Sequence, residues 1–85
     1  MKVQVVYTGR GYDQGAKLPG ELALDEGSSV SDALKALQQA APDVTLPESC
    51  LVSVAGTHLG TLAKHDARDL RDGDEIVLIA PVAGG

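Results

Sequence analysis

The feature that most constrains the fold is a single stretch with the apolar spacing of an amphipathic helix. Its apolar side chains recur three or four residues apart, at Val30, Leu34, Leu37 and Ala41. Ser29 stands directly before this stretch as an N-cap, Asp32 follows as its capping-box partner, and Pro42 ends it. The apolar segments elsewhere are short and alternate like strands, so we expect one helix that covers one face of a sheet.

The other apolar segments predict strands. Most of them alternate apolar and polar residues, which is typical of a strand with one buried face. The expected strands are Lys2–Tyr7, Glu21–Asp25, Cys50–Ala55, a short irregular one within Thr57–Leu62, and Glu75–Ala80. The last strand is apolar on both faces, which favours a central position. The polar segment before it carries Leu70, which we expect to anchor that segment to the core.

The order of these elements predicts an α+β fold of the β-grasp type. The first and last strands would lie side by side at the centre and run parallel, because their connection passes through the helix and the third strand. The first two strands would form an antiparallel hairpin. We therefore expect a mixed sheet of four to five strands with the main helix on one face, formed by residues 1–80, and a flexible tail at residues 81–85.

The length and the net charge of the chain disfavour several classes of function. A chain of 85 residues forms one domain without a deep cleft, which disfavours an enzyme that must enclose a substrate by itself. Its net charge of −5 disfavours nucleic acid and anionic membranes and suits a partner with a basic docking face. Cys50 is the one cysteine, no apolar run is long enough to span a bilayer, and nothing resembles a signal peptide. These features favour a reducing cytoplasm.

Several residues that could suggest a nucleophile, a metal site or a nucleotide site are better explained by structural roles. Cys50 opens an apolar strand, so a small buried side chain is expected rather than a nucleophile. His58 and His65 have no third ligand nearby in the sequence, so no metal site is predicted. The glycines at 9, 11 and 15 have the wrong spacing for a dinucleotide fingerprint and indicate a hairpin loop.

Carboxylates crowd the segment before and at the start of the last strand. They are Asp66, Asp69, Asp72, Asp74 and Glu75. Without a cleft they are interpreted as a solvated surface that helps to attract a basic partner. One face of the last strand, Ile76 with Leu78 or Val77 with Ile79, is expected to remain exposed as an apolar docking patch, because one helix covers only one side of the sheet.

The end of the sequence carries the main functional signal. It reads Pro81, Val82, Ala83, Gly84 and Gly85. Pro81 ends strand pairing, and glycine lacks a Cβ, so such a backbone can enter a channel too narrow for side chains. The carboxylate of Gly85 would be an unhindered nucleophile that a partner enzyme could adenylate with ATP. Sulfide or a persulfide could then displace AMP and leave a thiocarboxylate.

The last fourteen residues resemble the C-terminus of MoaD-type proteins, the small subunits of molybdopterin synthase, and of their relatives such as ThiS. The helix start at Ser29-Val30 and the strand from Val52 to Gly56 also lie where these ubiquitin-like proteins have theirs. The resemblance implies that Gly85 is adenylated by an E1-like enzyme and then thiocarboxylated. It implies Pro81–Gly84 as the threaded, partner-binding tail, with no cofactor bound to the carrier and ATP used by the activating enzyme.

The resemblance also implies a set of protein partners. These are the activating enzyme, a sulfurtransferase or cysteine desulfurase as the sulfur source, and the large subunit of molybdopterin synthase. The glycine-rich region from Thr8 to Gly15 departs from the helical segment usual in the family. A carrier for thiamine or cysteine synthesis, a ubiquitin-like modifier of lysines, and a β-grasp binding module therefore remain alternatives.

Overall fold

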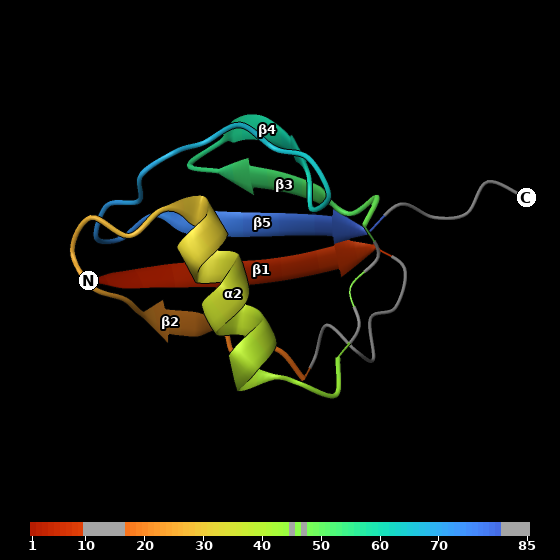
Figure 1. The fold of residues 1–85 in the computed structure, drawn as a ribbon, viewed down its shortest axis with the longest axis horizontal. Helices are drawn as coiled ribbons and strands as arrows, with labels where there is room; N and C mark the ends of the chain where they lie inside the picture. The colour runs from red at the N-terminus through yellow and green to blue at the C-terminus, as the bar shows by residue number, and fades with distance from the viewer. Residues whose placement is uncertain (10–16, 45, 47, 81–85) are drawn as a thin grey trace, which may run out of the picture.

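The computed structural model describes residues 1–9, 17–44, 46 and 48–80. Within them the chain forms five strands and one helix in the order expected from the sequence (Figure 1). The elements are β1 Lys2–Gly9, β2 Glu21–Ala23, α2 Val30–Ala40, β3 Leu51–Val54, β4 Thr57–Thr61 and β5 Glu75–Ala80. None of the described segments is a helix long and apolar enough to cross a membrane.

The strands form one mixed sheet in the order β2-β1-β5-β3-β4. The parallel pair β1 and β5 lies at its centre, with Val5 opposite Ile76 and Tyr7 opposite Leu78. The strand β2 pairs antiparallel with β1, and β3 pairs antiparallel with β5 and β4. The helix α2 crosses one face of this sheet (Figure 1). The predicted β-grasp architecture, with its central parallel pair and its first hairpin, is therefore confirmed.

The helix begins with the capping box that the sequence predicts. The backbone N–H of Asp32 donates to the Ser29 hydroxyl at 3.2 Å, and the Asp32 carboxylate accepts from the Ser29 backbone N–H at 3.0 Å. The helix ends at Ala40, one residue before the expected end, and Ala41 serves as its C-cap. Its fully buried residues are Val30, Ala33 and Leu37, whereas Leu34 lies at the edge of the core.

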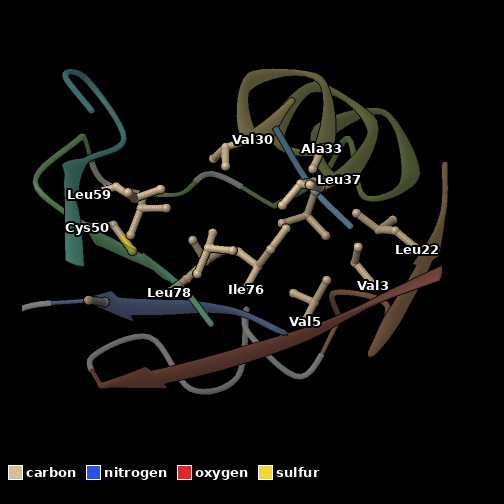
Figure 2. Close-up of a cluster of buried hydrophobic side chains, with 14 residues drawn as sticks. Val3, Val5, Leu22, Val30, Ala33, Leu37, Cys50, Leu59, Ile76 and Leu78 are labelled. Carbon is tan, nitrogen blue, oxygen red and sulfur yellow. The ribbon is translucent and has the colours of Figure 1, made fainter. Parts of the chain in front are cut away.

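The core is aliphatic and lies between the helix and the sheet. Figure 2 shows its labelled side chains filling the space between the two layers. Leu37 of the helix, Val3 of β1, and Ile76 and Leu78 of β5 are among the largest fully buried side chains. Leu70 is also buried, which confirms it as the anchor of the segment before β5. The core therefore fixes β1 and β5 from one side.

The boundaries of three strands differ from the sequence prediction. The strand β1 continues to Gly9 instead of ending at Tyr7, β3 ends at Val54 instead of Ala55, and β2 is shorter than expected. The strand β2 ends at Ala23 rather than Asp25, because its partner β1 begins at Lys2, which pairs with Ala23. The strand β3 begins at Leu51, and Cys50 is a buried residue just before it. The strand β4 has the expected irregularity, since its register with β3 shifts between Val52 and Ser53.

We expect the Asp32→Asn variant to unfold more easily than the wild type at neutral pH, with the difference disappearing in acid. Hydrogen bonds from the backbone and side chain of Ser29 lower the pKa of Asp32 below its ordinary value of 3.8. A carboxylate with a lowered pKa stabilises the fold above its unfolded pKa, and this contribution is lost as the pH falls through the folded pKa. Urea unfolding across the acidic range measures the difference, with Asp43→Asn as a control of equal charge change. A difference in unfolding free energy that stays constant into strong acid would contradict a stabilising role of the Asp32 carboxylate in the capping box.

Candidate functional site

The described part of the chain ends where β5 ends, at Ala80. The predicted tail, Pro81–Gly84 with Gly85, lies outside the described residues, and so does the boundary between body and tail. Ala80 is the last described residue before the predicted tail. Ala80 is buried and lies opposite Gly9, the last residue of β1, at the ends of the two central parallel strands (Figure 1). The central strand β5 therefore ends directly before the residues predicted to form the site.

Gly9 fits closely against Ala80. Its φ of +100° is one that residues with side chains rarely adopt. A Cβ at this position would also collide with the backbone oxygen of Ala80. The sequence predicts that Gly9 belongs to a hairpin loop, whereas in the structure it is the last residue of β1. A glycine directly after an apolar strand was the available signal, but the collision becomes visible only once β5 is placed beside it.

We expect Gly9→Ala to lower the free energy of unfolding by about 2 kcal/mol, because the new side chain adds backbone strain and a backbone clash at the same point. The clash would also shift Ala80, and with it the start of the tail. Chemical denaturation measures the loss of stability. Gly20→Ala is the matched control, since no atom of the described residues lies within 4 Å of a Cβ placed there. Equal stability of the two variants would show that the close approach at Gly9 is not required.

The face of the sheet opposite the helix carries an apolar patch. Residues Ile76 and Leu78 of β5 point into the core, so the alternate residues Val77 and Ile79 point to the other side. The strand registers place Val6 beside Val77 and Leu51 beside Ile79. We call these four residues the open-face patch. Val6 is 40% exposed and the other three are half-buried.

The open-face patch lies on the side of β5 that is available to a partner. Among the described residues, no helix covers this face, because α2 lies on the other one (Figure 1). Polar residues from the neighbouring rows border the patch: Gln4, Thr8, Ser53 and His58. An apolar centre with a polar border is the usual composition of a protein docking surface.

Cys50 is fully buried, as the sequence predicts. Burial raises the pKa of its thiol, and a hydrogen bond with the backbone of Ile79 opposes that shift only in part. Its Sγ lies 3.8 Å from the backbone oxygen of Leu51. A raised pKa keeps the side chain as a thiol and therefore a weak nucleophile. Cys50 thus serves in packing.

The two histidines lie in different places. His58 is an exposed residue of β4, whereas His65 is hydrogen-bonded by both ring nitrogens, to the Ser31 hydroxyl and the Thr61 backbone oxygen. Within the described ranges, no group of three or more His, Cys, Asp or Glu side chains could hold a metal ion. The hydrogen bonds of His65 connect the segment after β4 to the helix α2.

The acidic segment includes two carboxylates with local structural roles. Asp72 accepts a hydrogen bond from the backbone N–H of Lys2 at 2.7 Å, and Asp74 accepts one from the backbone N–H of Arg71 at 2.9 Å. Together they hold the turn before β5 against the start of β1. Asp66, Asp69 and Glu75 are exposed. This arrangement fits a solvated surface rather than an acid–base pair.

Comparison with known proteins yields a family and a fold. The family model described as "ThiS family" matches residues 12–85, a range that includes the Gly84-Gly85 end. No curated protein matches the chain at a significant level.

Solved structures that share the fold of this chain include three with TM-scores of 0.60 or more. SAMP1 from Haloferax volcanii has a TM-score of 0.71 and 23% identity, over 100% of both chains. A Pyrococcus furiosus protein provisionally named molybdopterin converting factor, subunit 1, has a TM-score of 0.71 and 22% identity, over 96% of this chain and 99% of that one. A second structure of H. volcanii small archaeal modifier protein 1 has a TM-score of 0.60 and 24% identity, over 95% of this chain and 98% of that one. At these identities the structures establish the shared fold.

Proposed function

The chain belongs to the ThiS family of ubiquitin-fold sulfur carriers, and from that premise we propose that it carries sulfur as a thiocarboxylate on Gly85. The observation that supports this most is that the family match extends through Gly85, five residues beyond the end of β5 at Ala80. In this proposal the folded domain, residues 1–80, is the part that partner enzymes recognise, and the last residues supply the reactive group. The protein acts in this account as a non-catalytic carrier, and its partners catalyse the reactions.

The proposed chemistry has two steps. A carboxylate oxygen of Gly85 attacks the α-phosphorus of ATP in the active site of an E1-like partner, and pyrophosphate leaves. Sulfide then attacks the acyl carbon, the bond to AMP breaks, and the thiocarboxylate remains. If a persulfide on a sulfurtransferase or cysteine desulfurase supplies the sulfur, a thiol must also cleave the acyl disulfide that forms. The carrier itself needs no bound cofactor for either step.

The residues before Gly85 suit this chemistry. Gly84 and Gly85 have no side chains, so their backbone can pass through a narrow channel to the nucleotide. Pro81 cannot donate to a sheet ladder, so it separates this segment from β5. We propose that residues Pro81–Gly84 contact the channel of the activating enzyme.

The open-face patch is the proposed docking surface for the activating enzyme. Its residues Val77 and Ile79 belong to β5, the strand that leads to the tail, so an enzyme bound there would be close to the start of the tail. The net charge of −5 would favour a partner with basic residues around its own apolar surface. Docking through the body and threading of the tail would then occur together.

Molybdopterin synthesis is the pathway we propose, with the large synthase subunit as the acceptor complex. The Ala-Pro-Val-Ala-Gly-Gly ending favours this pathway, and the name of the Pyrococcus furiosus protein points the same way for that protein. Conjugation of Gly85 to lysines is the second candidate, because the fold matches small archaeal modifier protein 1. Both functions use the same carboxylate.

Intact-mass measurement separates these functions. The purified chain is incubated with ATP, a sulfur source and an extract of the host, with a matched sample lacking ATP. Replacement of one oxygen by sulfur, only when ATP is present, supports the carrier. Adducts of higher mass joined by isopeptide bonds would instead support the modifier. An unchanged mass in an extract that activates carriers of this family would contradict both.

A further inference from the structure

A second surface feature lies on the helix side of the sheet, away from the open-face patch. A hollow of about 360 Å³ opens between α2 and the segment that follows β4. Its floor is formed by three partly buried leucines from three parts of the chain, Leu34, Leu46 and Leu62. Ligand pockets range from roughly 300 to 1,000 Å³, so this hollow has room for a few side chains rather than for a large cofactor. We call it the helix groove.

The rim of the helix groove is polar and partly fixed by hydrogen bonds. The carbonyl oxygen of Thr61 can only accept, so the Nδ1 of His65, 3.1 Å away, donates to it. In the neutral imidazole the Nε2 then accepts from the Ser31 hydroxyl, at 3.2 Å. Across the groove, the side-chain amide of Gln38 donates to the backbone oxygen of Val44 at 2.9 Å. These hydrogen bonds hold the walls of the groove in place when no ligand is bound.

The charge of the rim is opposite to that of the whole chain. Among the described residues that line the groove, Lys35 carries a positive charge and none is a carboxylate, although the chain has 12 acidic and 7 basic residues. The nearest acidic residues in the sequence are Asp32 and Asp66. Asp32 accepts a hydrogen bond from the Ser29 backbone in the capping box and also interacts electrostatically with Lys35, and Asp66 is exposed. Neither carboxylate lines the groove. A ligand with a carboxylate near an apolar group would complement both the rim and the floor.

We propose that the helix groove binds a short segment of a partner protein that carries aliphatic side chains beside a carboxylate. The aliphatic side chains would cover Leu34 and Leu62, and the carboxylate would face the ammonium group of Lys35, which is exposed. Because α2 and the open-face patch lie on opposite sides of the sheet, this partner and an activating enzyme could bind at the same time. The proposal does not depend on the chemistry of Gly85, and it can be tested on the purified chain alone.

Titration with short peptides, followed by backbone amide NMR shifts of the full chain, tests this proposal. The probes are acetyl-Glu-Leu-Leu-Glu-amide, its Lys-Leu-Leu-Lys analogue and its Glu-Ser-Ser-Glu analogue, all at low salt. We expect the first peptide to bind with a millimolar to upper micromolar Kd and to shift Ser31, Lys35, Leu62 and His65. We expect the other two to bind at least about fivefold more weakly, since each lacks one of the two complementary features.

Two charge reversals complete the test. Lys35→Glu should weaken binding of the Glu-Leu-Leu-Glu peptide about tenfold, because it removes the attraction and adds repulsion. Lys17→Glu is the matched control, with the same charge change at an exposed lysine outside the groove, and should leave the affinity nearly unchanged. Equal loss in both variants, shifts that map to the open-face patch, or no shifts at the highest peptide concentration would overturn the proposal.

Discussion

Deleting Gly85 is expected to abolish thiocarboxylate formation while leaving the melting temperature nearly unchanged. The deletion removes the proposed reacting group and leaves the terminal carboxylate on Gly84. This carboxylate is one residue too short to reach the nucleotide in the activating enzyme. The described core residues all lie between Val3 and Ala80, so none of them is lost. Intact mass after activation measures the first effect, and thermal unfolding measures the second.

A chain with one extra residue after Gly85 is the natural companion to this deletion. It retains both glycines but moves the carboxylate forward, so it should also fail to form the thiocarboxylate. A shortened chain that is modified at the wild-type rate would rule out Gly85 as the reacting residue. A large fall in melting temperature would show that the last residue contributes to the folded body.

The Val77→Asp variant is expected to lower the efficiency of activation at least tenfold, with a raised KM for the carrier. Val77 lies at the centre of the open-face patch, beside Val6 on one side and Ser53 on the other. A carboxylate there would have to be desolvated when the activating enzyme binds. The free energy of this desolvation would be several times larger than the free energy lost with the apolar contact. Steady-state kinetics of ATP-dependent AMP release, with carrier concentration as the variable, measures the effect.

Ser53→Asp provides the matched control for Val77→Asp. Ser53 lies opposite Val77 in the register of β3 and β5, so the same charge is placed one strand away on the same face without removing a patch residue. We expect a smaller rise in KM for this variant. If Val77→Asp folds and is activated normally, the enzyme docks elsewhere on the carrier.

The sequence was sufficient to predict the fold because its signals are local. The spacing of Val30, Leu34 and Leu37, with Ser29 before them, specified the helix. The doubly apolar β5 indicated a central strand, and the chain order made its pairing with β1 parallel. These patterns depend on periodicity and capping, which single residues and their near neighbours determine.

The surface features could not be predicted, because they depend on residues that are distant in sequence. Both faces of β5 are apolar, so only the position of α2 shows that Val77 and Ile79 lie on the open side. The requirement for glycine at position 9 arises from Ala80, and the bonds of His65 arise from Ser31 and Thr61. The reacting residue itself was inferred from the chemistry of its backbone and from family resemblance, and it remains a prediction.

The central claim is tested most directly by locating the sulfur. The carrier is reacted with its purified activating enzyme, ATP and sulfide, cut with a protease, and its C-terminal peptide is fragmented in a mass spectrometer. We expect one sulfur in place of one oxygen on the terminal carboxyl of Gly85. Sulfur found instead on the thiol of Cys50, or an unmodified Gly85 when the enzyme has released AMP, would contradict the account.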